Sequence, residues 1–369
     1  MDKLVKLSGS NAERNYKIAN EDQENNTHFT FKNVLVATNN FSETNKLGEG
    51  GFGPVYKRNM LVGHEEVAIK RLSKKSGQGL EEFMNELRLI AKLQHNYLVR
   101  LLGCCVEKGE KILIYEYLCN RSLDKFLFGS PVKSKLDWLK RVKVIEGIAQ
   151  GLLYIHKYSR LKIIHRDLKA SNVLLDAAMN PKISDFGMAR IFRIDQAEAN
   201  TNRIVGTYGY MSPEYAFYGQ FSKRSDVFSF GVLLLEIVSR RRNTDFYDPE
   251  VLFSLVCWAW ELWGKRKPED LIDPSAKGTC SNPREAMKYI CVSSFCIHVG
   301  LLCVQEAPGE RPTMSAVALM LSSSDPHSFP LPGEPAFTTK TPDVVIENGD
   351  QVHVNCSNNQ MTMSLPSGR

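Results

Sequence analysis

The chain has no apolar run that approaches the roughly 20 consecutive residues that a membrane-spanning helix needs. Its first residues, MDKLVKLSGSNAER, also lack the apolar stretch of a secretory signal peptide. Asp2 excludes N-myristoylation, because that modification requires glycine at the second position. As the sequence is written, we therefore expect no direct membrane span, no lipid anchor and a cytoplasmic location.

The cysteines lack any spacing that is typical of a metal site, and their number, nine, is odd. Free cysteines behave as small apolar residues and are commonly buried. Six of the nine are adjacent to each other or lie in apolar surroundings: Cys104, Cys105, Cys257, Cys291, Cys296 and Cys303. We therefore expect buried free thiols in a reducing compartment.

Lysine and arginine are scattered and form no basic stripe, and the net charge is only +6. Such a charge can favour a phosphorylated small molecule or an acidic partner, but it does not predict nucleic-acid binding. With 369 residues, of which 43% are hydrophobic, the chain is long enough for one large domain or two lobes.

The apolar pattern changes along the chain and divides it into segments. In order, these are a polar leader at 1–28, a short helix within 29–42, a strand-rich region at 44–118 interrupted by a helical stretch at 79–93, a mostly helical region at 119–322, and an irregular tail at 323–369. This order predicts a small sheet-rich lobe and a larger helical lobe. Ligand sites favour such junctions.

A glycine-rich stretch, LGEGGFGPVYK at 47–57, places glycines at positions 48, 50 and 53. Such a pattern could open a dinucleotide-binding unit, form a plain turn, or bring backbone N–H groups close to phosphate oxygens. Val55 and the following EEVAIKRL at 65–72 continue as strands rather than as a helix. The pattern therefore favours a hairpin that covers phosphates, with Lys70 as their cation.

A lysine that binds phosphates needs a carboxylate to hold it. Glu86 lies on the inward face of the helical stretch 79–93, three residues after Phe83. Glu81 and Glu82 are alternatives, but they lie near the start of the helix, where acidic residues favour the helix dipole. We therefore expect Glu86 to pair with Lys70.

HRDLKASN at 165–172 is a highly polar loop between two apolar runs, and ISDFGMAR at 183–190 places another acid in a turn. Each charged residue alone could serve a loop salt bridge. Together, Asn172 and Asp185 fit the few oxygen ligands that Mg²⁺ takes from a protein. Asp167 could then accept a proton from an attacking hydroxyl, and Lys169 could stabilise the charge on a transferred phosphoryl group.

The motifs GEGGFGPV, VAIK, HRDLKASN, DFG and SPE occur in the order found in eukaryotic protein kinases, and the chain resembles that family over about 44–322. ATNNFS, GTYGYMSPEYA, SDVFSFGVLLLEIVS and HVGLLCVQEAPGERPTM are similar to the intracellular domains of plant receptor-like serine/threonine kinases, and the final residues to their S-domain (G-type lectin) branch. The resemblance implies an α+β, bilobal protein kinase fold, with a small lobe at 44–118 and a larger helical lobe at 119–322, after a leader and pre-kinase helix at 1–43.

The resemblance also implies the ligands, ATP and Mg²⁺, with Mn²⁺ as a substitute for Mg²⁺. The expected ATP-binding residues are Leu47, Gly48, Glu49, Gly50, Gly51, Phe52, Gly53, Val55, Ala68, Lys70, Tyr115, Glu116, Leu118 and Leu174. Among them Val55, Ala68 and Leu174 would enclose adenine, and Glu116 and Leu118 would offer it backbone groups. Tyr115 would narrow the pocket behind it.

Substrate type and regulation follow from the same resemblance. Lys169 matches the serine/threonine form of the loop, and Thr207 should lie beside Asp167 and Lys169. Arg166 precedes the catalytic aspartate, and its charge should be neutralised by a phosphate on the activation segment, roughly 185–214. Thr201 is the first candidate to carry that phosphate. The expected partners are protein substrates with serine or threonine and, for a receptor-type kinase, membrane receptor kinases.

Structural roles are also implied for the larger lobe. Glu214 should pair with buried Arg311, and Asp226 should cap the backbone of the 165–167 turn. Three stretches depart from the family pattern: Asn96-Tyr97, which could weaken a turn, Arg58 in place of glycine, and an apparent insertion at 289–295. The insertion could extend a helix, pack poorly, or reflect an error in the gene sequence.

The leading function is phosphorylation of serine and threonine on proteins, including this chain itself. A different reading is a weakly active or inactive kinase fold that acts as a scaffold or decoy for a membrane receptor. The complete set of Lys70, Glu86, Asp167, Asn172 and Asp185 argues against it. A third hypothesis is a small-molecule phosphotransferase of similar fold. The GTYGYMSPE segment argues against it, because such enzymes lack this segment. As a fragment or partner of a receptor, the chain would lie at the cytoplasmic face of the plasma membrane.

Overall fold

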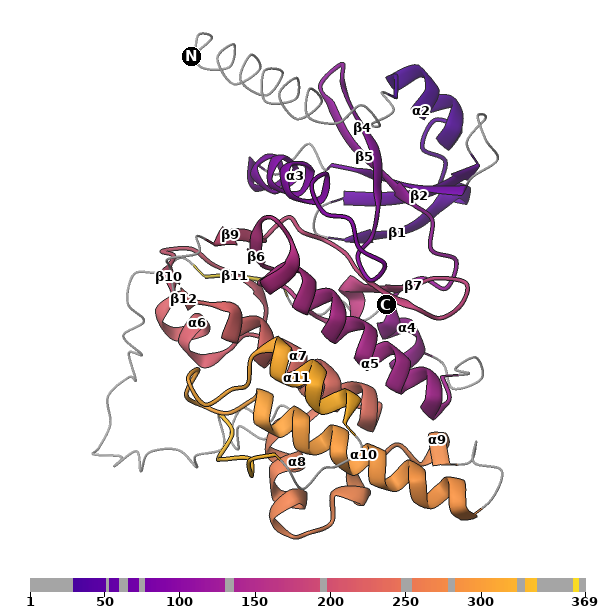
Figure 1. Cartoon of the computed structure of the whole chain (residues 1–369). Coiled ribbons are helices and arrows are strands. Elements are labelled where there is room, and N and C mark those ends of the chain that lie inside the picture. The colour runs from indigo at the N-terminus through magenta and orange to yellow at the C-terminus, as the bar shows by residue number, and fades with distance from the viewer. Residues whose placement is uncertain are drawn as a thin grey trace, which may run out of the picture. The chain divides into compact units, whose positions relative to one another are not determined.

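The computed structural model describes residues 29–50, 53–59, 66–72, 77–129, 136–192, 198–246, 254–277, 283–323, 329–336 and 361–364. The chain forms two compact units, whose elements are labelled in Figure 1. Unit 1 runs to Cys119 and includes Ser184–Ala189, whereas unit 2 comprises Asn120–Ile183 and the chain from Arg190 onward.

Unit 1 is built on a five-stranded antiparallel sheet with the strand order β1-β2-β3-β5-β4. Its strands are β1 Lys46–Gly50, β2 Gly53–Asn59, β3 Glu66–Arg71, β4 Leu101–Glu107 and β5 Glu110–Glu116. The glycine-rich stretch connects β1 to β2, and β2 pairs with β3. This confirms the predicted strand-rich region and its hairpins. Arg58 lies in β2, and its side chain is outside the described part.

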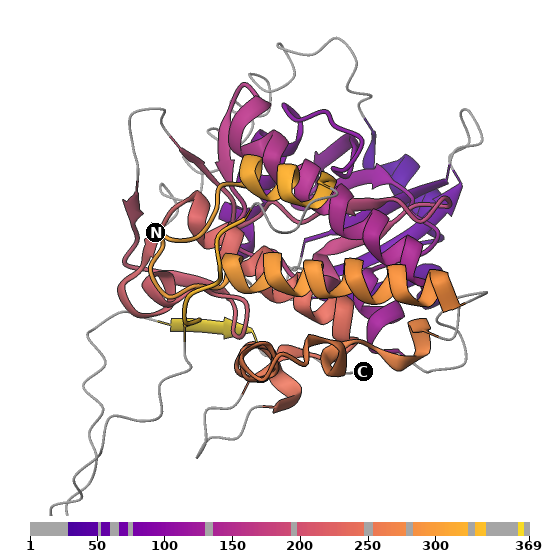
Figure 2. The ribbon, with the colours of Figure 1, turned by 60° about the horizontal axis from the view of Figure 1, so that its bottom comes forward.

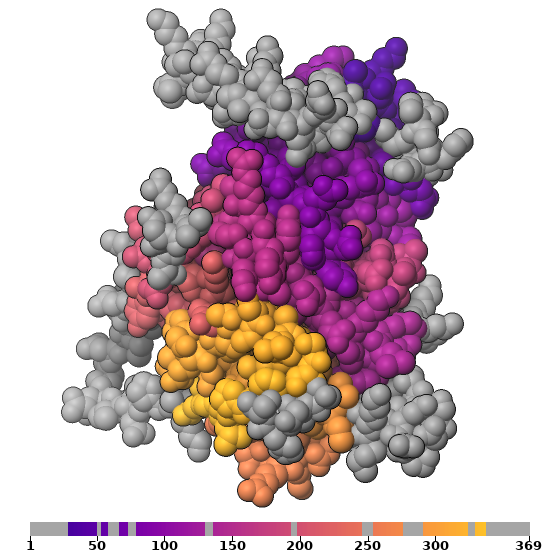
Figure 3. Space-filling model, in the orientation of Figure 1, coloured from indigo at the N-terminus to yellow at the C-terminus, as the bar shows by residue number. Residues whose placement is uncertain are grey.

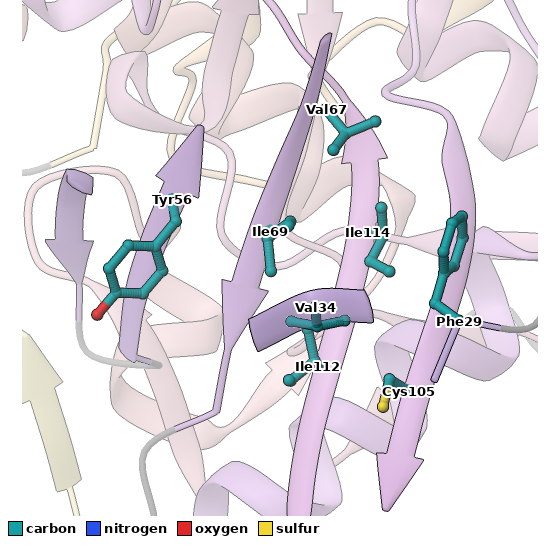
Figure 4. Packing of buried hydrophobic residues seen from close by; sticks show 8 residues of the cluster. All are labelled: Phe29, Val34, Tyr56, Val67, Ile69, Cys105, Ile112 and Ile114. Carbon is teal, nitrogen blue, oxygen red and sulfur yellow. The ribbon is translucent and has the colours of Figure 1, made fainter. Parts of the chain in front are cut away.

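One face of the sheet is buried in an apolar cluster, shown in Figure 4. Successive side chains of a strand point to opposite faces. In β3, Val67 and Ile69 are therefore in the cluster, together with Ile112 and Ile114 of β5. The intervening Lys70 does not belong to this cluster, so the same alternation that builds the core directs the lysine to the other face.

The segment before the sheet completes the cluster. Helix α2, Phe31–Thr38, contributes Val34, and Phe29 is buried just before the helix (Figure 4). The Thr30 side chain caps the start of the helix, and Asn39 ends it in the left-handed conformation with φ 50°. The helix predicted within 29–42 is therefore confirmed, although it ends at Thr38.

Helix α3, Gly77–Ile90, carries Glu86 and buries Phe83, Leu87 and Ile90 at helical spacing. This confirms the helical stretch predicted at 79–93, although the helix ends at Ile90. The following turn is closed at His95, whose Nδ1 accepts from the Tyr97 N–H at 3.3 Å. Its carbonyl accepts from the Leu98 N–H at 3.1 Å. The departure at Asn96-Tyr97 thus leaves a hydrogen-bonded turn.

Unit 2 is mostly helical and is organised around α7 (Figure 2). Its helices are α4 Leu123–Leu127, α5 Trp138–Leu153, α6 Pro213–Tyr218, α7 Lys223–Ser239, α8 Leu255–Gly264, α9 Pro274–Lys277, α10 Pro283–Cys303 and α11 Met314–Ser322. Helix α7 is mostly apolar and is buried from Ser225 to Ser239, and α5, α8 and α10 pack against it. Glycine at 231 permits the contact with α10, since a Cβ there would lie 2.6 Å from the Cys303 Cβ.

Short strands of unit 2 frame its polar loops. They are β6 Lys162–Ile164, β7 Val173–Leu175, β8 Pro181–Ile183, β9 Arg190–Phe192, β10 Ala199–Asn200, β11 Ile204–Thr207, β12 Gln220–Phe221 and β13 Met361–Ser364. They pair as β6–β9, β7–β8, β10–β12 and β11–β13. Strands β6 and β7 flank the loop at 165–172, so the two apolar runs on either side of it form short strands.

The apparent insertion at 289–295 lies inside α10, which is continuous from Pro283 to Cys303. Of the alternatives for this segment, the helix extension is therefore the one observed. Within the described side chains, Ser293 is buried and the Phe295 ring lies 5.9 Å from the Phe329 ring. The insertion is thus packed against a residue of the C-terminal tail.

Part of that tail is fixed to unit 2, and Figure 3 shows its yellow atoms on the surface. The imidazole of His298 donates from Nε2 to the Pro330 carbonyl at 2.8 Å, and the Ala336 N–H donates to the Val304 carbonyl at 3.1 Å. Residues 361–364 differ from the irregular structure predicted for the tail, because they form β13. A four-residue strand stabilised by pairing with a distant strand carries too little local signal to be predicted.

The sheet-based unit 1 and the helical unit 2 confirm the predicted α+β class. Among the described helices, none is long and apolar enough to cross a membrane. All seven cysteines in the described part are free thiols. Burial raises the pKa of Cys105 to about 11, and of Cys104 and Cys296 to about 12. The prediction of buried thiols is wrong for Cys291, which lies on an exposed face of α10.

Candidate active site

In unit 1, Lys70 lies between two carboxylates. Its Nζ donates to Glu86 Oε2 at 2.8 Å and to Asp185 Oδ1 at 3.0 Å. Burial alone would lower the pKa of Lys70, but the charges of Asp185 and Glu86 outweigh it and hold the pKa above its ordinary value. The predicted Lys70–Glu86 pair is confirmed, and Lys70 is a permanent cation fixed beside Asp185.

Asp185 is held in a strained turn. Its φ of 67° lies in the left-handed region, which non-glycine residues seldom adopt. The Asn85 side chain of α3 stabilises this turn, because its Nδ2 donates to the carbonyls of Gly187 at 2.8 Å and Ala189 at 2.7 Å. The role of Asn85 was not predicted. Its position beside Glu86 is the only signal that the sequence offers.

Tyr115 of β5 also binds Glu86. Its hydroxyl donates to Glu86 Oε1 at 2.5 Å, so both carboxylate oxygens of Glu86 are engaged. Burial and the neighbouring Glu86 charge raise the pKa of Tyr115 well above its ordinary value, so the phenol stays a hydrogen-bond donor. Tyr115 was predicted only to narrow the adenine pocket. Its contact shows a second task, which is to hold Glu86 in place for Lys70.

Most of the other predicted nucleotide-binding residues of unit 1 lie in or next to strands of the sheet. Val55 lies opposite Lys70 in the β2–β3 register, and Ala68 lies opposite Tyr115 in the β3–β5 register. The backbone N–H of Glu116 donates to the Arg100 carbonyl at 3.1 Å. Leu47, Gly48, Glu49 and Gly50 lie in β1, Gly53 begins β2, and Leu118 is buried after β5. Gly51 and Phe52 lie outside the described residues.

In unit 2, the carboxylate of Asp167 is surrounded by donors. Thr207 Oγ1 donates to Asp167 Oδ1 at 2.7 Å, and Asn172 Nδ2 donates to Oδ2 at 2.9 Å. Lys169 Nζ lies 3.1 Å from Oδ2 and also donates to Thr207 Oγ1 at 2.7 Å. The predicted position of Thr207 beside Asp167 and Lys169 is thus confirmed. Leu174 follows in β7.

The backbone that presents Asp167 is fixed from below by Asp226 of α7. Its two carboxylate oxygens accept the backbone N–H groups of His165 at 2.8 Å and Arg166 at 2.9 Å. His156 Nε2 donates to the same carboxylate at 2.8 Å. Burial alone would raise the pKa of Asp226, but these hydrogen bonds lower it and keep the carboxylate charged. The cap predicted for Asp226 is confirmed.

Arg166 is buried beside aromatic rings. Its guanidinium donates to the Tyr215 hydroxyl at 2.5 Å and lies over the Phe221 ring at 4.6 Å. Burial lowers the pKa of Arg166, and the like charge of Arg190 lowers it further. Arg190 lies opposite Ile164 in the β6–β9 register, which places its charge near Arg166. Thr201, the predicted phosphate acceptor, has its hydroxyl bonded to the Arg203 carbonyl at 3.0 Å.

Each unit carries one side chain with an oxygen of the type that Mg²⁺ accepts. Asp185 supplies a carboxylate, and Asn172, whose amide nitrogen is bonded to Asp167, has an amide oxygen of the type that Mg²⁺ accepts. Within the described residues, no cluster of three or more histidine, cysteine, aspartate or glutamate side chains could hold a metal.

The sequence of the chain matches a known protein family. A family model described as protein tyrosine and serine/threonine kinase matches residues 41–321. The chain belongs to the protein kinase family. The family predicted from the motifs is thereby confirmed, and the residues of both units can be compared with those that a kinase uses.

The most similar relatives include plant receptor-like kinases. The kinase is 54% identical over 342 residues to a G-type lectin S-receptor-like serine/threonine-protein kinase of Arabidopsis thaliana. This alignment covers 92% of this chain and 39% of the relative. It is 56% identical over 307 residues to cysteine-rich receptor-like protein kinase 10 of the same plant. That alignment covers 83% of this chain and 44% of the relative. The chain thus spans less than half the length of these relatives.

Helix α7 carries another buried acid besides Asp226, and this acid was not predicted. Glu236 of α7 accepts from the Tyr210 hydroxyl at 2.5 Å and from the Asn243 N–H at 2.9 Å. Burial raises the pKa of Glu236 to about 7, despite these two hydrogen bonds. Tyr210 belongs to the GTYGYMSPE segment, so this contact ties the segment to the core helix of unit 2.

Replacing Glu236 with glutamine should flatten the pH dependence of unfolding. The folded-state pKa is raised from 4.5, so the unfolded chain loses this proton at a lower pH than the folded chain. Glu236 therefore leaves stability unaffected below pH 4.5, reduces it as the pH rises toward 7, and reduces it fully above 7, by about 3 kcal/mol. Urea unfolding from pH 5 to 8 would measure this. Exposed Glu261→Gln is the control, and a slope in Glu236→Gln equal to that of the parent would contradict the assignment.

Proposed function

We propose that this chain is an ATP-dependent kinase that transfers the γ-phosphate of ATP to serine and threonine hydroxyls of proteins. The observation that carries this proposal is the Asp167 carboxylate, which is held by Thr207, Asn172 and Lys169 in one fixed orientation. A carboxylate so placed can accept the proton of a substrate hydroxyl as that hydroxyl attacks phosphorus. Lys169 can stabilise the negative charge on the transferred group.

The residues of unit 1 support the nucleotide side of this function. Lys70, kept charged by Glu86 and Asp185, would bind the α- and β-phosphates of ATP. Asp185 and Asn172 would hold Mg²⁺, or Mn²⁺ in its place, which neutralises phosphate charge when bound. Tyr115 would hold Glu86 in place for Lys70, and Asn85 would hold the turn that carries Asp185. Little covalent chemistry falls to the protein, since positioning and charge supply most of the rate.

Specificity for serine and threonine rests on Lys169 and Thr207. Lys169 bridges Asp167 and Thr207 and so narrows the space beside the catalytic carboxylate. The matched relatives include one that is named a serine/threonine-protein kinase. A short aliphatic hydroxyl that reaches Asp167 beside this lysine is therefore the acceptor that we infer, rather than a tyrosine phenol.

Autophosphorylation of the activation segment is part of the proposal. Burial and the like charge of Arg190, which lies opposite Ile164 in the β6–β9 register, lower the pKa of Arg166, so the two arginines repel each other. A phosphate adds about −1.5 to −2 charge and would relieve this repulsion. Thr201 is the first candidate acceptor, because it lies on the same segment, next to the β10–β12 pair. Its phosphate would order the segment against both arginines.

The wider setting is inferred from the relatives. Because the printed names of the relatives describe receptor-like kinases, we propose that this kinase acts in receptor-type signalling. Its partners would be protein substrates with serine or threonine and membrane receptor kinases. As part of a receptor, or docked to one, it would work at the cytoplasmic face of the plasma membrane.

Phosphate transfer by the purified chain with Mg²⁺, beside Asp185→Asn, tests the function. The parent should transfer the γ-phosphate of ATP to a general protein acceptor, with phosphate mapped to Thr201 by mass spectrometry. Asp185→Asn should be slower by at least about a hundredfold, because it weakens metal binding while Lys70 keeps Glu86. Exposed Asp270→Asn, with the same chemical change, should match the parent. Equal rates in Asp185→Asn and the parent would refute the assignment.

A further inference from the structure

The C-terminal segment Met361–Ser364 pairs with the activation segment. Strand β13 runs parallel to β11, and the register places Met361 opposite Ile204 and Ser364 opposite Thr207. In Figure 1 this short yellow strand lies beside β11. Two strands that are more than 150 positions apart in sequence therefore form one hydrogen-bonded sheet.

The geometry of β11 explains why it accepts a strand on one side only. The Tyr215 hydroxyl donates to the Val205 carbonyl at 2.7 Å and accepts from the Val205 N–H at 3.1 Å. Neighbouring residues of a strand direct their backbone groups to opposite sides. Ile204 and Gly206 therefore direct theirs away from Tyr215. On that side β11 offers an edge of the kind that binds extended peptides.

The edge is also held close to the catalytic loop. Gly206 has φ +144°, and a Cβ at this position would lie 3.1 Å from the Arg166 carbonyl and 3.0 Å from the Met211 Cε. Only glycine fits this approach without displacing its neighbours. A peptide paired with β11 is thereby aligned against the backbone that presents Asp167.

The register ends at the catalytic residues. Thr207, the partner of Ser364, donates its hydroxyl to Asp167 and accepts from Lys169, both at 2.7 Å. Paired strands lie about 4.8 Å apart, so the backbone of Ser364 is one strand spacing from that of Thr207. Thr362, the other hydroxyl residue of β13, pairs with Val205 and lies two residues further from the loop.

We propose that Met361–Ser364 is a substrate segment carried by the kinase itself, with Ser364 as the phosphate acceptor. This inference rests on the proposed kinase function. The Ser364 hydroxyl oxygen attacks the γ-phosphorus of ATP and forms the new oxygen–phosphorus bond. The bond from phosphorus to the β–γ bridging oxygen breaks, ADP leaves, and the hydroxyl proton passes to Asp167. A tethered acceptor has an effective concentration of the order of millimolar, so the segment also competes with other substrates.

Time-resolved mass spectrometry of the full chain, purified without phosphate and then given ATP and Mg²⁺, tests the inference. We expect phosphate on Ser364, at a rate per molecule that does not change when the chain is diluted a hundredfold. Thr362→Pro removes a backbone N–H from β13 and should slow this reaction by about tenfold or more. Thr362→Val, which keeps a β-branched side chain, is the matched control and should leave the rate near that of the parent.

Hydrogen exchange without ATP gives a second readout. Amides of β11 should be protected in the parent and in Thr362→Val, and less protected in Thr362→Pro. Phosphate on casein or Thr201 with none on Ser364 would overturn this inference alone. Equal Ser364 rates in the two Thr362 variants would also overturn it. A folded chain that transfers phosphate to no acceptor at all would overturn the proposed function with it.

Discussion

Replacing Asp167 with asparagine should lower the rate of phosphate transfer by about 10²- to 10⁴-fold while the fold remains intact. The asparagine has the same shape but cannot accept a proton from the substrate hydroxyl. Its oxygen can take the place of Oδ2, which accepts from Asn172 and lies near Lys169. Its amide can donate to the Thr207 hydroxyl, which both donates and accepts. The contacts around the site are therefore largely preserved, and the loss falls on the chemical step.

Steady-state kinetics with a serine-containing acceptor would measure this effect. We expect kcat to fall and the KM for ATP to change little, because Asp167 does not belong to the phosphate-binding group of Lys70. Exposed Asp270→Asn again serves as the matched control, and ATP binding by calorimetry reports on an intact nucleotide site. A kcat within threefold of the parent would show that Asp167 is not the base.

The second large effect concerns stability, at Arg311. The guanidinium is fully buried and donates to both oxygens of Glu214, at 2.8 and 2.9 Å. It also donates to the carbonyls of Gln305 and Glu306, both at 2.7 Å. Burial alone would raise the pKa of Glu214, but Arg311 outweighs it and lowers the pKa. The predicted Glu214–Arg311 pair is confirmed, and it joins α6 to the loop after α10.

Arg311→Met should reduce the free energy of unfolding by about 3–5 kcal/mol, because it leaves the largely buried Glu214 carboxylate without its cation. This is a large part of the ~5–15 kcal/mol that stabilises a typical domain. Denaturant unfolding followed by tryptophan fluorescence measures it. Lys265→Met is the control, since Lys265 pairs with Glu261 on an exposed face at 3.4 Å and should change stability by less than about 1 kcal/mol. Equal effects of the two substitutions would contradict the role given to Arg311.

The sequence predicted those site residues that belong to a short motif or to a strand or helix with a clear apolar period. The loop at 165–172 could be placed because Ile163 and Ile164 precede it and Val173 follows, all fully buried. Lys70 could be placed because β3 alternates, so that Ile69 enters the core and the lysine does not. Glu86 followed from helical spacing relative to Phe83. In each case a local period fixes the direction of the side chain.

The contacts that the sequence did not predict join residues that are distant along the chain. Asn85 binds backbone carbonyls about 100 positions later, and Tyr115 of strand β5 binds Glu86 of helix α3. Glu236 lies near the end of an apolar helix and is buried beside Tyr210. The pairing of β13 with β11 likewise depends on an edge that exists only after Tyr215 has folded against Val205. Such contacts depend on tertiary packing, which leaves no periodic trace.

The most direct test of the central claim is the identity of the phosphorylated amino acid after the purified chain has acted on a mixed protein acceptor with ATP and Mg²⁺. Acid hydrolysis and separation of the phosphoamino acids should give phosphoserine and phosphothreonine, without phosphotyrosine, and the same products should appear on the chain itself. A folded chain that binds ATP and yields no phosphoamino acid would contradict this account. It would favour a kinase fold that serves as a binding scaffold.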